Sequence, residues 1–398
     1  MDMAVKRLIL KRFRSVPSET VDLANPTFLV GRNGSGKSNL VDAFDFLAEA
    51  AVSPLHAVFD RRGGISKVRN RTSGTGYPPN MGLGVELGRL NGGCSEGRYA
   101  FEVKALPNYG FEVIREQCVS SCSDGRYYFM REGNEFSSNV KAVKPVLDPA
   151  SLCLPVVGGD VRFAPILRAL SAMRVYSIDP FRVREMQDPD SGVSLKRDGS
   201  NTASVLQQIE RESHDDMERV CEILSTIAPN TTDVRAKKLG NKLSLEFTQE
   251  WGKKKRLSFE AFNMSDGTLR AIGLLAAVFQ KPTPSLLVVE EPEATIHPGA
   301  LGAVLDLLRH ASRQMQVIVT THSPDVLNAE WIEASHLRIV EWAEGATYVR
   351  PISDAARSML KDHLMGAGDL MRSNVLEAER LFPETEDLRQ QGLFEVVA

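Results

Sequence analysis

The chain opens with short stretches in which apolar and polar residues alternate, which is the pattern of β-strands. Three strands are predicted between residues 5 and 30, and the last of them is the apolar run 27–30. Apolar residues then recur at helical spacing over 39–51, which predicts a helix with one buried face. A glycine-rich loop therefore separates the third predicted strand from the first predicted helix.

Residues 60–135 have a different character, because alternating apolar segments are separated by glycines. This pattern is typical of antiparallel hairpins. Helical spacing then returns in three segments, and alternation returns in two more: 161–173, 201–212 and 215–227, then 233–237 and 243–247. A β-rich part followed by a helical part is expected.

Helix and strand patterns alternate between residues 265 and 350, which is typical of a parallel α/β core. The apolar strand 286–289 ends in two acids, and the strand 317–319 ends in Thr-Thr-His. We therefore predict an α/β fold with four parts: a split core at 1–55 and 240–352, a β-rich insertion at 56–150, a helical lobe at 151–239 and a helical C-terminal tail at 353–398.

Composition narrows the class of protein. The chain has 398 residues, 42% of them hydrophobic, and a net charge of −3, which argues against a surface that coats nucleic acid throughout. Its five cysteines are scattered without a CxxC pair, so we expect reduced thiols and neither a disulfide framework nor a zinc site. No apolar signal segment is evident, and no stretch approaches the ~18 apolar residues of a membrane span. A cytoplasmic protein without a membrane partner is expected.

Residues 31–38 read Gly-Arg-Asn-Gly-Ser-Gly-Lys-Ser, a complete GxxxxGK[ST] phosphate loop between a predicted strand and a predicted helix. The glycines let backbone N–H groups turn toward an anion, Lys37 can reach the outer phosphates, and the Ser38 hydroxyl can hold Mg²⁺. The expected nucleotide contacts are Gly31, Arg32, Asn33, Gly34, Ser35, Gly36, Lys37, Ser38 and Asn39.

Glu290 and Glu291 close the apolar strand 286–289. In a phosphate-loop ATPase the first acid would hold Mg²⁺ and the second would orient the attacking water. Asp is commoner at the first position, and the extra methylene of Glu290 places its carboxylate about 1.5 Å farther out. A solvated acidic turn is the alternative interpretation, and a nucleotide-gated scaffold without hydrolysis is another.

Two further motifs contain residues that could contact a phosphate group. Ser265, Asp266 and Gly267 open a predicted helix, whose N-terminus can offer N–H groups to an anion, although helix capping alone also explains the motif. His322 follows a strand, where its imidazole can hydrogen-bond a γ-phosphate, although a structural histidine is the alternative.

The order of these motifs resembles ABC-type ATPase heads, and in particular the clan of OLD, Septu and RecF/SMC ATPases. The resemblance rests on the phosphate loop and on five other segments: Phe13-Arg14-Ser15, Ser265-Asp266-Gly267, Glu291-Pro292-Glu293, His297-Pro298 and Thr321-His322-Ser323-Pro324. The Glu-Pro-Glu and His-Pro elements favour the OLD-like branch, many of whose members belong to bacterial anti-phage systems. Residues 196–201 also resemble a segment of predicted ATPases in that branch.

The resemblance implies a head-to-tail homodimer or a higher oligomer. ATP and Mg²⁺ on residues 31–38 of one copy would be capped by Ser265, Asp266 and Gly267 of the other. It assigns Lys37 and Ser38 to phosphate and Mg²⁺ and Glu290 to Mg²⁺, with Glu291 as the water-orienting residue and His322 as the γ-phosphate sensor. Arg12 and Arg14 are candidates for contacts with adenine or DNA, although a solvated strand end is the alternative interpretation. Residues 67–70 offer no glutamine for a Q-loop.

Our first functional hypothesis is an ATPase subunit that controls a separately encoded nuclease or toxin in anti-phage defence. Nothing between residues 38 and 265 sustains the heptads of a long coiled coil, and the tail has no room for a Toprim nuclease. The alternative is a RecF-like repair clamp on duplex DNA. Basic residues could then contact phosphates, although such runs are often only solvated faces: Arg61, Arg62, Lys67, Arg69, Arg71, Lys253, Lys254, Lys255 and Arg256.

Overall fold

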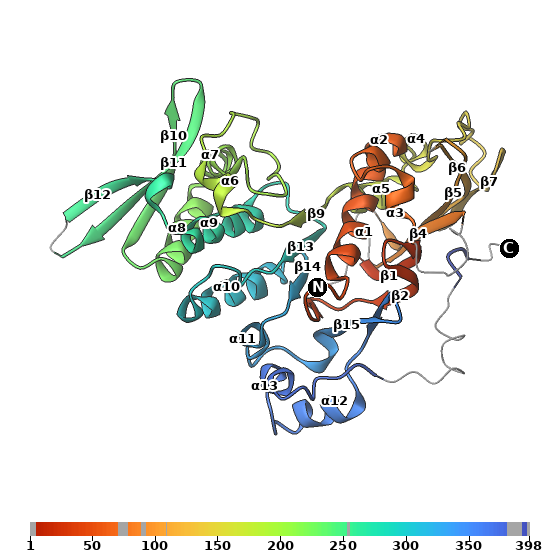
Figure 1. Cartoon of the computed structure of the whole chain (residues 1–398). Coiled ribbons are helices and arrows are strands. Elements are labelled where there is room, and N and C mark those ends of the chain that lie inside the picture. Colours follow the sequence, from red (N-terminus) through yellow and green to blue (C-terminus); the bar gives the residue numbers. More distant parts are fainter. Residues whose placement is uncertain are drawn as a thin grey trace. The chain divides into compact units, whose positions relative to one another are not determined.

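The computed structural model describes residues 5–70, 79–88, 93–108, 110–252, 255–379 and 392–395. The chain divides into two compact units, which we describe separately (Figure 1). Unit 1 comprises residues 1–173, 334–361 and 376–398, and unit 2 comprises residues 174–333 and 362–375. Within the described residues, no helix combines the length and the apolar character that crossing a membrane requires.

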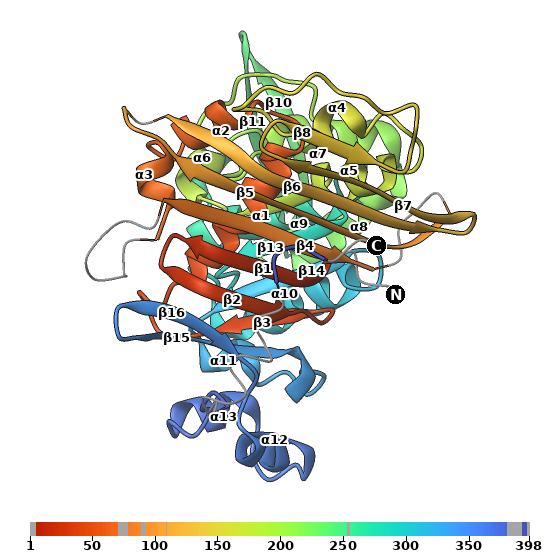
Figure 2. The ribbon, with the colours of Figure 1, turned by 90° about the vertical axis from the view of Figure 1, so that its right-hand side faces the viewer.

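Unit 1 contains a seven-stranded antiparallel sheet in the order β2-β1-β4-β5-β6-β7-β8, seen with its strands side by side in Figure 2. Its strands are β1 (Val5–Phe13), β2 (Val16–Asp22), β4 (Asn80–Leu87), β5 (Cys94–Ala105), β6 (Phe111–Cys122), β7 (Gly125–Glu132) and β8 (Glu135–Ser138). The predicted hairpins are confirmed. They continue the sheet of the first two strands through the pairing of β1 with β4, which local patterning does not reveal.

One face of this sheet is buried under helices, chiefly α1 (Lys37–Ala50) and α5 (Ala164–Ser171). Phe46 of α1 is at the centre of the contact, with its ring centroid 5.9 Å from that of Phe13, 5.2 Å from Phe59 and 6.1 Å from Phe101. Rings at these separations attract each other beyond the burial of their area. The helix that follows the phosphate loop is therefore anchored in an aromatic core. The described part of the unit also contains the helices α2 (Leu55–Asp60), α3 (Ile65–Val68), α4 (Leu154–Val157) and α12 (Asp354–Lys361) and the 3-10 helix η2 (Ala334–His336).

A second group of strands in unit 1 positions the phosphate loop. The strand β3 (Thr27–Val30) forms a parallel pair with β15 (Leu337–Ala343). In turn, β15 forms an antiparallel pair with β16 (Ala346–Arg350). All four residues of β3 are buried, as expected for a parallel strand covered on both faces. The loop therefore starts from a fixed strand end.

Unit 2 pairs two parallel strands, β13 (Leu286–Glu290) and β14 (Gln316–Thr321), with Glu290 opposite Thr320. Helices α8, α9 and α10 pack against one another, and a three-stranded antiparallel sheet extends from them. The remaining elements with residues in this unit are β9 (Met173–Tyr176), α6 (Pro180–Arg184), α7 (Thr202–Glu212), α8 (His214–Ile227), β10 (Thr231–Leu239), β11 (Lys242–Trp251), β12 (Lys255–Glu260), the 3-10 helix η1 (Ala261–Asn263), α9 (Asp266–Phe279), α10 (Pro298–Ala311), α11 (Pro324–Leu327) and α13 (Ala367–Arg372). The predicted grouping of 1–55 with 240–352 in one core stays a prediction.

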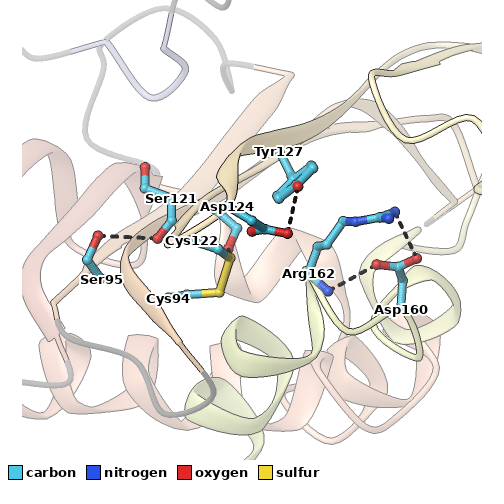
Figure 3. Close-up of a disulfide and its surroundings, with 9 residues drawn as sticks. Cys94, Ser95, Ser121, Cys122, Asp124, Tyr127, Asp160 and Arg162 are labelled. Atoms are coloured by element: carbon cyan, nitrogen blue, oxygen red, sulfur yellow. Dashed lines mark hydrogen bonds and ion pairs between the residues drawn. A yellow bond between two sulfur atoms is a disulfide. The ribbon is translucent and has the colours of Figure 1, made fainter.

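Cys94 and Cys122 lie opposite each other on β5 and β6 and form a disulfide (Figure 3). The expectation that all five cysteines are reduced is therefore wrong for this pair. The two residues are 28 positions apart, and the register of the strands alone brings them together. The free cysteines are Cys118, Cys153 and Cys221.

The C-terminal region that we expected to be helical is helical only in part. Among its described residues, α12 and α13 are helices, whereas 375–379 and 392–395 are not. Residues 392–395 lie against the seven-stranded sheet, where Leu393 joins a buried cluster with Ile9 and Ala100. Helical spacing in this region does not reveal that contact.

Candidate nucleotide site

The phosphate loop has the backbone that its glycines predict. Gly34 has a φ of 79° and Gly36 a φ of 102°, both in the left-handed region that favours glycine. The helix α1 begins at Lys37 without a side-chain cap. An uncapped helix N-terminus directly after such a loop is the arrangement that binds phosphate.

Strands β15 and β16 leave no room behind this loop. A Cβ atom on Gly36 would lie 2.1 Å from Thr347 Oγ1, and a Cβ on Gly31 would lie 2.3 Å from the carbonyl oxygen of Val340. Real Cβ atoms do not approach other atoms so closely, so larger residues at these two positions would displace the loop.

Hydroxyl and amide groups tie the loop to the turn between β1 and β2. Thr347 Oγ1 donates to the Ser35 carbonyl at 3.0 Å and lies 2.7 Å from Ser15 Oγ. The side-chain amide of Asn39 donates to the same Ser15 Oγ at 2.6 Å. Asn39, predicted as a nucleotide contact, thus supports the loop through Ser15. Sequence reasoning gave no role to Thr347, which lies over 300 residues after the loop.

The polar side chains of the loop fit an anionic ligand. Lys37 Nζ donates to the carbonyls of Gly31 at 2.7 Å and Arg32 at 3.0 Å, which holds the ammonium over the loop. Ser35 Oγ is buried without a hydrogen-bond partner. Ser38 is exposed at the start of α1. A buried orphan hydroxyl beside a cradle of glycines is consistent with a polar ligand at this place.

Two arginines proposed for ligand or DNA contacts are occupied within unit 1. Arg14 Nε donates to Asp42 Oδ2 at 2.8 Å. Arg62, whose side chain is only 6% exposed, bridges Asp42, Asp45 and Glu49 on one side of α1. The interpretation of Arg62 as part of a solvated or DNA-binding face is therefore wrong. Arg71, Lys253 and Lys254 lie outside the described residues.

Unit 2 brings Glu291 and His322 together. The parallel pairing of β13 with β14 places both residues just beyond the ends of neighbouring strands. Their side chains meet with Nδ1 of His322 3.0 Å from Oε1 of Glu291. The backbone N–H of Glu291 donates to the Thr320 carbonyl at 3.0 Å. Both side chains remain more than a third exposed, so they are open to a ligand.

The loop after β13 is strained at two positions. Glu291 has a φ of 44° and Thr295 a φ of 64°, a region that non-glycine residues rarely adopt. A Cβ on Gly267 would lie 2.7 Å from the Thr295 carbonyl oxygen, so this loop packs closely against the start of α9. Strain of this kind costs on the order of 1–3 kcal/mol per residue and is concentrated at functional sites.

Ser265 caps helix α9, since its Oγ accepts from the N–H of Thr268 at 3.2 Å. Asp266 forms an ion pair with Arg184, and both Ser265 and Asp266 are exposed. The capping interpretation of this motif is therefore realised. The predicted contact of Ser265, Asp266 and Gly267 with a nucleotide on a second copy stays a prediction.

Two arginines that sequence reasoning left without a role hold the acidic strand end. Arg270, which is 8% exposed, donates to the carbonyls of Ile178 at 2.8 Å, Glu290 at 3.0 Å and Glu291 at 2.8 Å. Burial lowers the pKa of Arg270 from its ordinary value, while the neighbouring carboxylates oppose that shift. Arg197 donates to Glu290 Oε1 at 2.8 Å. The sequence offered one signal for these two arginines: Arg197 lies in the segment 196–201, and Arg270 follows the Ser265-Asp266-Gly267 motif closely.

The assignment of Mg²⁺ to Ser38 and Glu290 stays a prediction. No group of three or more His, Cys, Asp or Glu side chains that could hold a metal occurs in the part of the chain described. The candidates Ser38 and Glu290 would supply two oxygens. Mg²⁺ is usually bound in this way, by few side chains and with water and phosphate oxygens as its other ligands.

Residues 27–328 match a family described as "AAA domain, putative AbiEii toxin, Type IV TA system". No curated protein matches the chain. Among solved structures, an Smc head bound to the C-winged helix domain of ScpA is 16% identical, with a TM-score of 0.57 over 87% of this chain and 96% of that one. An Smc head from Pyrococcus furiosus with an extended coiled coil, bound to the C-terminal domain of ScpA, is 15% identical, with a TM-score of 0.56 over 92% and 100%.

A third Smc head, from Pyrococcus yayanosii, is 12% identical, with a TM-score of 0.51 over 92% of this chain and 100% of that one. At these identities the likeness concerns the fold alone. It confirms the predicted fold class, a mixed α/β head of the SMC/ABC type with an antiparallel β subdomain.

Proposed function

Because the chain belongs to the AAA-domain family that residues 27–328 match, we propose that it binds and hydrolyses ATP with Mg²⁺ as a head-to-tail dimer or higher oligomer. We propose further that nucleotide state lets it control a separately encoded nuclease or toxin in bacterial anti-phage defence. A family description that names a toxin and a toxin–antitoxin system supports the second part. The observation that carries the first part is the strained Glu291, whose carboxylate meets His322 just beyond the end of a buried apolar strand.

In this proposal the phosphate loop binds the triphosphate. Backbone N–H groups of residues 33–38 surround the phosphates, and Lys37 exchanges the carbonyls of Gly31 and Arg32 for phosphate oxygens. The support of Ser35 by Thr347 keeps the loop in this conformation before the nucleotide arrives. Binding energy is then not spent on ordering the loop.

The acidic strand end supplies the catalytic groups. Phosphoryl transfer needs positioned charge more than covalent help. Arg270 fixes the backbone of Glu290 and Glu291, and His322 orients the Glu291 carboxylate, which can then accept a hydrogen bond from the attacking water. Mg²⁺, when bound, would neutralise charge on the phosphates. Glu290 would hold it only after exchanging or sharing its contact with Arg197.

The exposed start of α9 supports the proposed dimer. Ser265 and Asp266 lie at a helix N-terminus whose dipole favours an anion. A γ-phosphate contacted by two copies would favour the closed dimer, and hydrolysis would remove that preference. This gives the assembly two nucleotide-dependent states that an effector can distinguish.

Steady-state phosphate release tests the enzymatic part. We expect Lys37→Ala to lose turnover through lost nucleotide binding, and Glu291→Gln to lose turnover while retaining ATP. The matched controls are Lys361→Ala and Glu341→Gln, exposed residues with the same chemistry, which should leave turnover unchanged. Undiminished phosphate release by both site variants would refute the assignment.

The regulatory part needs a separate test. The product of the gene next to this one should co-purify with the Glu291→Gln chain in ATP, and should be released or altered in activity when ATP is omitted. Protection of cells from phage should then require both genes and Lys37. A chain that hydrolyses ATP but neither binds that product nor protects cells would refute the defence role and leave the ATPase standing.

A further inference from the structure

The outer face of the seven-stranded sheet holds a short segment of the chain's own C-terminal region. In β5, Phe101 points to the aromatic core under α1, so its neighbour Ala100 points to the opposite face. Residues 392–395, Gly-Leu-Phe-Glu, lie on that opposite face, drawn as the short blue ribbon beside the sheet in Figure 1. The segment and the sheet both belong to unit 1.

Glycines in β4 form a socket for Leu393. A Cβ on Gly82 would lie 2.3 Å from Leu393 Cδ2, and a Cβ on Gly84 would lie 3.1 Å from Leu393 Cδ1. Ile9 and Ala100 complete the socket, and Leu393 is 6% exposed within it. Two glycines at alternate positions weaken a strand, so their presence here indicates that the space is used.

Gln117 binds the backbone of the segment. Its side-chain amide donates to the carbonyl of Glu395 at 2.8 Å, and its side-chain oxygen accepts from the N–H of the same residue at 2.8 Å. Gln117 is 1% exposed. A buried amide that reads both backbone groups of one residue recognises an extended peptide whatever side chain that residue carries.

Three arginines complete the recognition. The guanidinium of Arg115 lies 4.3 Å from the ring centroid of Phe394, Arg98 donates to the Gly392 carbonyl, and Arg126 pairs with the Glu395 carboxylate. A hollow of about 530 Å³ continues along this face beside Glu395. The surface thus has separate places for a leucine, an aromatic ring and an acid in succession.

We propose that this face is a docking site for a partner protein's extended segment that carries leucine, an aromatic residue and an acidic residue in sequence, and that residues 392–395 occupy it in cis until displaced. The resident segment makes no regular strand pairing and is held mainly by side chains, which a competing segment of the same chemistry can reproduce. Because the resident segment belongs to the same chain as the sheet, a competing segment must bind tightly or be tethered itself.

A labelled peptide of residues 390–398 tests the proposal on the full chain. We compare the wild-type chain with a tail variant, Leu393→Asp with Phe394→Ala, in which the resident segment is released. The tail variant should bind the peptide saturably, and the wild-type chain at least tenfold more weakly, because its own segment competes. A control peptide with Leu393 and Phe394 changed to alanine keeps the charge and should not bind either chain.

Site variants in the tail-variant background locate the binding. Gly84→Val should abolish peptide binding by filling the socket, and Gln117→Ala should weaken it at least tenfold, with unfolding temperatures showing that each chain is folded. The milder tail variant Phe394→Ala, changed at a half-buried residue, repeats the test should the double change unfold the sheet. Equal binding by wild-type chain and tail variants, binding of the control peptide, or no binding at all would overturn the proposal.

Discussion

Replacing Thr347 by valine tests whether a strand distant in sequence supports the phosphate loop. The change keeps the shape of the side chain and removes one hydroxyl. That hydroxyl is buried, donates to the Ser35 carbonyl at 3.0 Å and contacts Ser15 Oγ at 2.7 Å. Ser15 keeps its bond from Asn39, so the main loss is at Ser35, whose carbonyl is left without this donor.

The expected cost follows from that unpaired carbonyl. Leaving a buried acceptor unsatisfied costs about 1–3 kcal/mol, which we expect as a fall in the free energy of unfolding of unit 1 in urea. If the loop relaxes locally instead, the fraction of chains with a binding-competent loop falls, and nucleotide affinity falls by up to about tenfold for each 1.4 kcal/mol. Fluorescent nucleotide titration separates the two cases.

Thr232→Val is the matched control. Thr232 is exposed on β10, and its hydroxyl makes only a long contact of 3.4 Å to the Thr248 carbonyl. Its replacement should change the unfolding free energy by no more than about 0.5 kcal/mol and leave nucleotide affinity unchanged. If Thr347→Val cannot be distinguished from Thr232→Val in either measurement, the strand does not support the loop and this reasoning fails.

Three other perturbations have defined outcomes. Arg62→Met removes the buried guanidinium that three carboxylates of α1 share, although Asp42 keeps Arg14 and Glu49 keeps the more distant Arg61, and should lower the unfolding free energy by about 3 kcal/mol in urea. Thiol titration of the unreduced, unfolded chain should find 3 free thiols among five cysteines, and reducing the bond between Cys94 and Cys122 should lower stability by about 3–4 kcal/mol for its 28-residue separation. The hydrogen bond from Lys281 lowers the pKa of Asp216, so this stabilisation is present at neutral pH and lost as pH falls through the lowered pKa. Asp216→Asn should therefore destabilise the chain at pH 7, and its difference from the wild-type chain should shrink as the pH falls through the lowered pKa.

Most helices and strands of the fold could be predicted from local sequence patterns. The motif at residues 31–38 needs a strand before it and a helix after it, and both neighbours have their own apolar patterns, so β3 and α1 were predictable. The same holds for the hairpins of the β-rich part, where alternation and glycines agree. The pairing of distant strands could not be predicted, because the alternation of apolar residues and the turn residues do not specify which strands pair.

In the candidate site, too, residues with a local sequence signal were predicted, and residues placed only by the fold were not. Glu291 and His322 were predicted because each ends an apolar strand, and parallel pairing brings strand ends to one edge. Thr347 carries no local mark, since a threonine in a strand is ordinary and only the fold places it behind Ser35. Arg62 was read as surface because arginines usually are, and three carboxylates at helical spacing on α1 were the overlooked signal.

Complementation between two inactive variants tests the central claim, that one copy's phosphate loop and another copy's Ser265 form a single active site. The two variants are Lys37→Ala and Ser265→Arg, and circular dichroism first establishes that each chain is folded. Each variant alone should lack ATP turnover. When mixed in equal amounts, half of the dimers are mixed and each has one intact site, so about a quarter of wild-type turnover should return. A mixture as inactive as its components would contradict the shared site.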